Sequence, residues 1–237
     1  MTEWKARRFW RVATAEPVEG GVQLCLDGRP VRTPGKLPLV LPTRALAEAM
    51  AEEWNAQEDV IAPATMPVTR AANSAVERVT PFHGDVVAML AAYAETDLLC
   101  YRAEAPEALI RRQAEGWDPM LAWADAALGA GFRVTQGVLP VDQEAATLDR
   151  IRAILSGFAP FPLTAVHDLV TLSGSVVLGL AVAEGRLSPE TAFDLSRIDE
   201  VFQAEIWGED AEAAAAAADK RAQYLQAHRF LRLCCDG

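Results

Sequence analysis

The sequence predicts an α+β fold, in which a small β-rich N-terminal domain is followed by a larger all-α C-terminal domain. Two observations predict this class. Turn signals at Asp27-Gly28 and Pro34-Gly35 divide the first 41 residues into short segments of the length and composition of hairpin strands. Beyond them, apolar residues recur at helical spacing, beginning with Leu46, Met50 and Trp54. The change of pattern separates the two domains.

We place the first domain at residues 1–75, with one or two helices, and the second at residues 76–237. Three or four short antiparallel strands are expected in the first, starting near Phe9. Pro30 and Pro38 cannot donate hydrogen bonds to a sheet ladder, so they should lie at strand ends or edges.

The remaining elements are expected to be helices. Thr43 is a suitable N-cap for a helix over residues 44–57, and Asp142 for a later one. Pro119 should kink or split its helix. Ser173-Gly174-Ser175 lies inside an apolar segment and indicates close packing between helices rather than a nucleophile. The expected helical segments, with a strand-like linker at 131–139, are residues 68–78, 83–96, 106–129, 142–155, 162–184, 189–206 and 209–233.

Composition excludes several classes of function. The net charge is −11. Residues 1–41 carry a net charge of +3, and the remaining residues carry −14. An acidic body argues against binding to nucleic acid, which requires cations to replace phosphate counterions. The longest apolar stretches are too short to span a bilayer, so no stable membrane insertion is expected. The N-terminus fits neither a secretory signal nor a Ser-rich, acid-poor transit peptide.

The sequence shows no motif for catalysis or cofactor binding. Phosphate-binding loops, a dinucleotide fingerprint and a nucleophile elbow are all missing. The three histidines, His83, His167 and His228, have no metal-site spacing. His167 and Asp168 are neighbours on one helix and therefore poorly placed to form part of a triad. We expect no cofactor and no metal.

One acidic and aromatic cluster late in the chain is a candidate site. Asp199 and Glu200 lie about one helical turn before Gln203, which shares a helix face with Trp207. As catalytic acids, the carboxylates would need surroundings that separate their pKa values. A solvated helix end is the structural alternative. Tryptophan is also enriched at protein interfaces, so the same residues could form a binding surface.

Several stretches together resemble one family, the assembly chaperones specific for the F1-ATPase α subunit (the ATP-twelve family). The first domain carries GRPVRTP at 28–34, PLVLPT at 38–43, AEEW at 51–54 and PATMPVTRAAN at 63–73. The second carries TDLLCYR at 96–102, QAEGWDP at 113–119, DEVFQ at 199–203 and WGED at 207–210. Each motif is weak alone, but their order and spacing cover nearly the whole chain.

The resemblance implies a two-domain chaperone that binds the unassembled F1 α subunit without hydrolysing ATP. The important acidic residue of the family maps best onto Glu200, with Asp199 beside it, and we add Gln203 and Trp207 as partner-binding residues. A bacterial-type cytoplasmic protein, monomeric when free, is expected; a eukaryotic member would work in the mitochondrial matrix. The alternatives are a helical adaptor without a chaperone role and a small hydrolase using Asp199 or Glu200.

Overall fold

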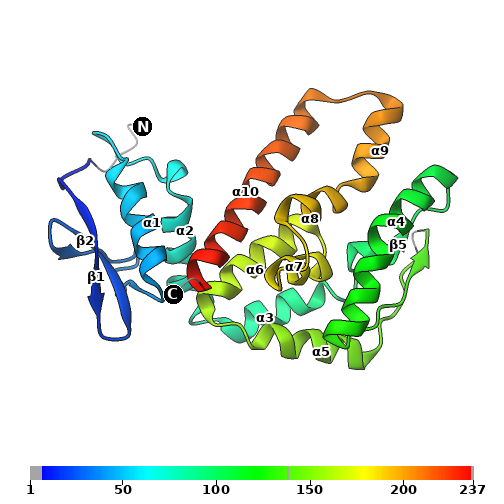
Figure 1. Ribbon diagram of the computed structural model, residues 1–237, viewed down its shortest axis with the longest axis horizontal. Helices are drawn as coiled ribbons and strands as arrows, with labels where there is room; N and C mark the ends of the chain where they lie inside the picture. Colours follow the sequence, from blue (N-terminus) through cyan, green and yellow to red (C-terminus); the bar gives the residue numbers. More distant parts are fainter. Residues whose placement is uncertain (1–6, 138, 236–237) are drawn as a thin grey trace. The chain divides into compact units, whose positions relative to one another are not determined.

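The computed structural model describes residues 7–137 and 139–235, and it confirms the α+β class (Figure 1). Strands occupy the N-terminal part of the chain, and helices dominate after residue 42. The chain divides into two compact units. Of the described residues, the first unit holds 7–83, 159–165 and 229–235, and the second holds 84–158 and 166–228. Three helices, α3 (His83–Ala92), α6 (Pro160–Ser173) and α10 (Ala211–Cys235), therefore contribute residues to both units, α3 with His83 alone in the first.

The first unit is built on an antiparallel sheet. Strand β1 (Ala13–Val18) pairs along the whole of β2 (Gly21–Leu26), and β3 (Arg29–Pro30) and β4 (Val40–Leu41) pair with the other edge of β2. Asp27 and Gly28 both adopt positive φ, of 47° and 76°, as a two-residue hairpin turn requires. Pro30 lies in a two-residue edge strand, as predicted.

Side chains cap the first turns of the two helices in this unit. Helix α1 (Arg44–Asn55) begins at Thr43, whose hydroxyl oxygen accepts a hydrogen bond from Leu46 N, and this N-cap was predicted correctly. The same hydroxyl donates to the carbonyl of Leu233 in α10. Helix α2 (Pro67–Ser74) continues into a wide turn over Ala75–Val79, and its first amides donate to the carboxylate of Glu53.

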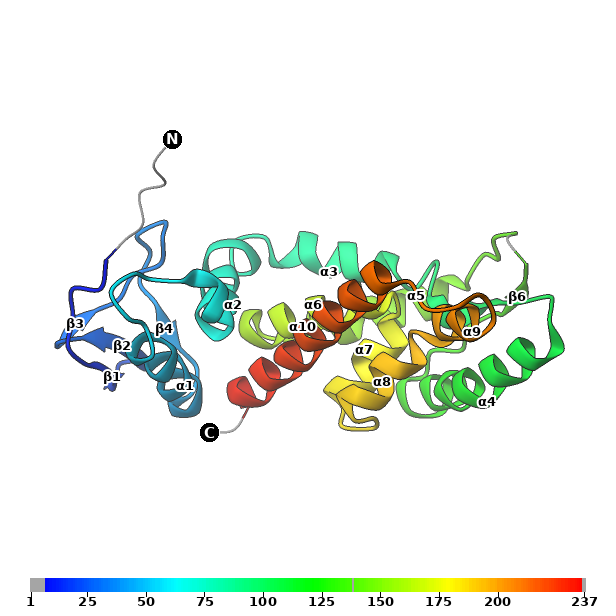
Figure 2. The same ribbon diagram turned by 90° about the horizontal axis from the view of Figure 1, so that it is seen from above.

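The second unit is almost entirely helical (Figures 1 and 2). Its core contains the fully buried side chains of Trp117, Leu99, Ile151 and Tyr224. A short parallel pair, β5 (Tyr101–Arg102) and β6 (Thr135–Gln136), accounts for the strand-like linker predicted at 131–139. Besides α6 and α10, its helices are α3 (His83–Ala92), α4 (Glu107–Trp123), α5 (Ala145–Ser156), α7 (Val176–Ala183), α8 (Pro189–Leu195) and α9 (Ile198–Trp207).

Two expectations about helix boundaries were wrong. Pro119, which was expected to kink or split its helix, lies inside α4, and this helix is continuous to Trp123 rather than split. Pro119 removes a hydrogen bond to the carbonyl of Glu115, and both residues are exposed, so water can solvate that carbonyl. The single helix expected at 189–206 is two helices, α8 and α9, separated at Ser196 and Arg197. The apolar segment 162–184 is also two helices, as described below.

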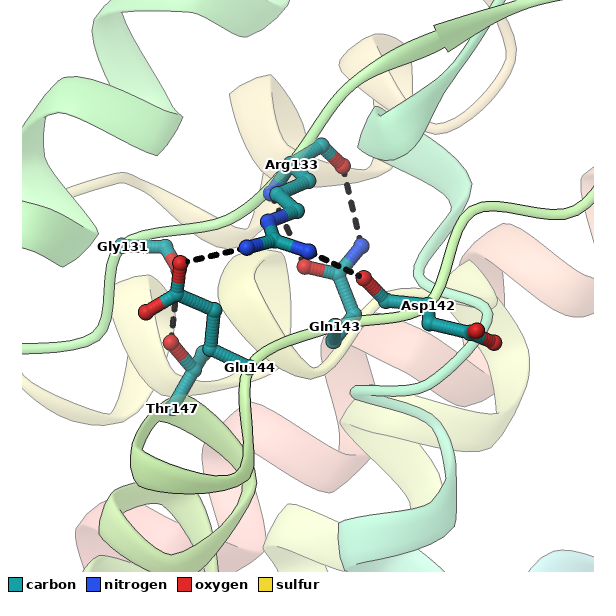
Figure 3. A network of polar contacts seen from close by, with 6 residues as sticks. All are labelled: Gly131, Arg133, Asp142, Gln143, Glu144 and Thr147. Atoms are coloured by element: carbon teal, nitrogen blue, oxygen red, sulfur yellow. Dashed lines mark hydrogen bonds and ion pairs between the residues drawn. The ribbon is translucent and has the colours of Figure 1, made fainter.

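Asp142 does not cap α5, because the helix begins at Ala145 and Glu144 occupies the N-cap position. Figure 3 shows the residues before α5 bonded instead to the segment at 131–133. The amide of Gln143 exchanges two hydrogen bonds with the backbone of Arg133, and Glu144 forms a 2.7 Å ion pair with its guanidinium. Thr147 donates to the carbonyl of Gly131. These tertiary contacts compete with the expected cap.

The predicted packing motif Ser173-Gly174-Ser175 is a helix break instead. Gly174 adopts a φ of 72°, which favours glycine, and ends α6. Ser175 caps α7 by accepting from Leu178 N. Its hydroxyl donates to the carboxylate of Asp97 at 2.8 Å. Asp97 is fully buried and also accepts from the amides of Leu99 and Val177, so one carboxylate connects two chain segments.

Burial raises the pKa of Asp97 to about 6, against the opposing effect of these hydrogen bonds. An acid with a raised pKa in the folded state stabilises the fold below its unfolded pKa, and this contribution is lost as pH rises through about 6. We predict that the unfolding free energy of wild type, relative to Asp97→Asn, rises by about 2 kcal/mol between pH 7 and pH 4. Urea denaturation of both proteins across this range measures it. A pH-independent difference would contradict the prediction.

Candidate functional site

Helix α9 carries the predicted site residues, and it is attached to α4 by one side. Ile198 and Phe202 are its buried residues, one turn apart. Gly116 of α4 allows close approach here, since a Cβ at this position would come within 2.9 Å of Ile198 Cδ1 and 2.8 Å of Leu195 Cδ2. Trp117 extends the attachment by donating its indole N–H to the carbonyl of Leu195 at 2.8 Å. This side of α9 is therefore fixed.

Two polar contacts complete the attachment. The buried amide of Gln113 donates to Asp199 Oδ1 at 2.7 Å and accepts from Ala103 N at 2.8 Å. Arg112 forms a two-pronged ion pair with Glu205, with N–O distances of 2.9 and 2.8 Å. The guanidinium of Arg112 also lies 5.3 Å from the ring centroid of Phe202. Neighbouring residues of α4 thus hold α9 at its first and second turns.

Helix α9 also borders an open groove of about 720 Å³ shared with α10, and Arg112, Ile198 and Glu205 from the attached side are among its lining residues. Val201 and Ala204 of α9 line one wall, and Ala213, Ala214, Ala217 and Ala218 of α10 line the other. Phe193 of α8 also lines the groove. Figure 1 shows α9 and the first half of α10 as two arms joined through residues 208–210. We call this feature the α9–α10 groove.

The structure divides the four predicted site residues. Asp199 is half-buried and bonded to Gln113, so it anchors α9 rather than facing solvent. Glu200 lines the α9–α10 groove and pairs with Arg197 at 2.7 Å. Gln203 and Trp207 are exposed on α9 outside the groove, and Trp207 has 85% of its surface accessible. Glu200 is thus the predicted residue that lies in the groove itself.

Sequence reasoning did not identify the second wall of the groove. Four of the six alanines at 213–218 line this wall, and all six are exposed or half-buried. The residues of α4 that hold α9, Arg112 and Gln113, were also missed, although Gln113 begins the motif at 113–119 that carries the family resemblance. An acidic helix followed by an alanine-rich helix was the available signal, but spacing within each helix does not show which helices meet.

The charges in the groove favour binding over acid–base chemistry. The hydrogen bond from Arg112 holds the pKa of Glu205 below its usual value, so this carboxylate stays ionised. Glu200 is likewise paired with Arg197. Within residues 7–137 and 139–235, no group of three or more metal-ligating side chains is assembled. Among these same residues, no helix combines the length and apolar character needed to cross a membrane.

Motifs of the first unit that carry the family resemblance mainly organise its local structure. Thr43 caps α1, Glu53 caps α2, and the turn at Asp27-Gly28 joins β2 to β3. Asn55 exchanges hydrogen bonds with both backbone groups of Ala13, which fixes α1 to β1. These residues explain the fold of the first unit without pointing to a ligand site.

An open apolar groove with paired charges is typical of a protein that binds other proteins. Comparison with known proteins makes the class specific. Residues 7–125 match the family model described as ATP12 chaperone protein. The chain is 26% identical over 215 residues to Protein atp12, mitochondrial, of Schizosaccharomyces pombe, covering 85% of this chain and 74% of that protein.

Solved structures agree over nearly the whole chain. Atp12 from Paracoccus denitrificans is 56% identical, with a TM-score of 0.95, covering 98% of this chain and 100% of that one. An aspartate-to-lysine mutant of P. denitrificans Atp12p matches with a TM-score of 0.96, at the same identity and coverage. The Atu1473 protein of Agrobacterium tumefaciens is 41% identical with a TM-score of 0.91, covering 97% and 86%. The chain belongs to the ATP12 chaperone family, as its sequence motifs indicated.

The attachment of α9 should depend more on Gln113 than on Arg112. Gln113→Ala removes a buried amide and leaves Asp199 and Ala103 N without their partner, which we expect to cost about 1–3 kcal/mol of unfolding free energy. Arg112→Ala removes a solvent-screened pair and should cost less. Urea denaturation of the two variants gives the comparison. An equal or larger loss for Arg112→Ala would show that the ion pair, not the amide, holds the helix.

Proposed function

We propose that this chaperone binds the unassembled α subunit of F1-ATPase, prevents its aggregation and supports F1 assembly. The observation that carries the proposal is the apolar surface that α9 leaves uncovered. Val201, Ile206 and Trp207 are 48%, 52% and 85% exposed, although each is a large apolar side chain. The relatives that carry the Atp12 name include a bacterial and a mitochondrial protein. We propose that this chain works in the compartment where F1 is assembled.

A chaperone of this kind needs only a complementary surface. An unassembled subunit exposes an apolar assembly face, which is an aggregation hazard. Covering that face with Trp207, Ile206 and Val201 removes apolar area from water on both partners, the dominant favourable term in protein association. Charged residues around these side chains keep the free chaperone soluble and orient the encounter. Binding and release on this scheme require no nucleotide.

Two other functions fit less well. A hydrolase using Asp199 or Glu200 would need the two carboxylates to converge on a substrate, whereas Asp199 accepts a hydrogen bond from Gln113 and Glu200 pairs with Arg197. An adaptor would bind a stable folded partner and have no effect on aggregation. The second alternative is separated from the chaperone by the experiment below, because only a chaperone changes the fate of an unfolded client.

We expect the protein to suppress aggregation of the F1 α subunit as that subunit refolds from denaturant. Light scattering at equal molar ratio, without ATP, should fall, and a complex of the two proteins should elute together on size exclusion. Serum albumin at the same mass concentration serves as the control for unspecific crowding. Unchanged scattering with no complex would remove the proposal.

The exposed tryptophan should contribute more to binding than to stability. Trp207→Ala is expected to weaken capture of the α subunit at least about tenfold, since buried tryptophans dominate many interfaces. Because Trp207 is 85% exposed in the free protein, the Trp207→Ala variant should unfold at the same urea concentration as wild type. Phe9→Ala in the first unit is the matched control, because Phe9 is 75% exposed. Loss of capture in Phe9→Ala alone would place the binding surface on the other unit.

Charge reversal tests the acidic residue assigned from the family. Glu200→Lys places a cation beside Arg197, with which Glu200 now pairs, and should weaken capture of the α subunit while leaving the circular dichroism spectrum unchanged. Asp149→Lys on α5 makes the same charge change at an exposed position and should have little effect. Equal binding by wild type and Glu200→Lys, both folded, would show that Glu200 is not a contact.

A further inference from the structure

We infer that the α9–α10 groove receives an amphipathic α-helix of the client, with a stripe of apolar residues flanked by lysine or arginine. The inference rests on the proposed function and specifies how the client is bound. It names a binding mode that uses both α9 and α10, whereas the residues considered above lie on α9 alone. The argument depends on the shape of the groove walls, their composition and their charge.

Both walls are helix faces with regular spacing. On α10 the lining residues Ala213, Ala217 and Arg221 recur every four residues, and Ala214 and Ala218 run beside them. On α9, the lining residues Glu200 and Ala204 are four residues apart, as are Val201 and Glu205. Residues at such spacing form ridges along a helix, and the grooves between them accept the ridges of another helix. A third helix therefore fits this surface better than an extended strand, which would need an exposed sheet edge.

The walls are lined by small residues, which favours close approach of a helix backbone. Alanine occupies five positions of the groove, and at these positions the side chains are short enough for a partner helix to approach closely. Val201, which is 48% exposed, supplies a larger apolar contact, and Phe193 also lines the groove although it is almost completely buried. A groove of about 720 Å³ is as large as a typical ligand pocket, but four of its charged side chains are already paired with one another, Arg112 with Glu205 and Arg197 with Glu200. The apolar lining matches an apolar helix stripe.

The charges around the groove determine the flanks of that helix. Of the charged side chains lining the groove, Arg112 pairs with Glu205 and Arg197 with Glu200. Three further carboxylates, Asp194, Glu209 and Asp210, line it against one further cation, Arg221. The groove is therefore acidic after its internal pairs are counted, and it complements basic residues beside the apolar stripe of the bound helix.

The experiment uses the full-length protein and two fluorescent peptides of about 18 residues, long enough to hold helical structure. Both carry the same stripe of leucine and alanine, flanked by lysines in one and by glutamates in the other. Fluorescence anisotropy should show binding of the lysine peptide at least about tenfold tighter than of the glutamate peptide. The lysine peptide should also displace the F1 α subunit from its complex with the chaperone.

Two variants localise the binding. Ala217→Trp fills the groove and should weaken binding of both the lysine peptide and the α subunit by at least about tenfold. Ala215→Trp makes the same substitution at an exposed position of α10 that does not line the groove, and should leave both affinities within about twofold. Circular dichroism and urea denaturation confirm that both variants are folded.

The outcomes separate this inference from the proposed function. Capture of the α subunit by wild type and by Ala217→Trp with equal affinity would overturn the groove as the binding site while leaving the chaperone function intact. Failure of wild type to capture the α subunit would overturn the proposed function, and with it the identity of the bound helix. Equal binding of the two peptides would overturn the inference that the groove prefers basic flanks. Equal binding of the lysine peptide to both tryptophan variants would overturn the groove as its binding site.

Discussion

The arrangement of the candidate site depends on the hydrogen bonds of one buried amide, that of Gln113. It connects the backbone after β5 to the carboxylate of Asp199 at the start of α9. A helix of ten residues is too short to be stable alone, and α9 buries only Ile198 and Phe202. Because so little apolar area holds α9, the amide and the Arg112–Glu205 pair must fix its orientation. Because α9 makes so few contacts, Val201, Ile206 and Trp207 remain exposed.

This constraint changes the interpretation of the acidic cluster. Asp199 and Glu200 are neighbours in sequence, but a step of about 100° along a helix turns them toward different surroundings. Asp199 is used internally by Gln113, whereas Glu200 lines the groove. A substitution at Asp199 would disturb the attachment of α9 before it altered any contact with a partner. A substitution at Glu200 would alter the surface directly, which makes it the more informative of the two for binding.

Much of the fold could be predicted because its signals are local. The Thr43 cap, the Asp27-Gly28 turn and the helical spacing of apolar residues depend on chemistry within a few residues. The errors occurred where contacts between residues far apart in the sequence determine the local structure. Asp142 lost its capping role because Gln143 and Glu144 bond to Arg133, and the helix break at Gly174 is held by Asp97, far away in sequence. The alanine run gives the same local pattern whether it is packed or exposed, so its exposure could not be predicted.

The openness of the groove bears on how a client would leave without ATP. Apolar burial contributes about 25 cal/mol per Å², so alanine side chains add little free energy each, and the affinity must be distributed over many small contacts. Such an interface can be released in steps, as a competing subunit covers one part of the client surface after another. A deep pocket that enclosed one large aromatic anchor would instead concentrate the affinity and slow dissociation. On the proposed function, the next subunit needs only to bind the same client surface more tightly, so the small contacts made by the groove alanines would favour release while Trp207 would favour capture.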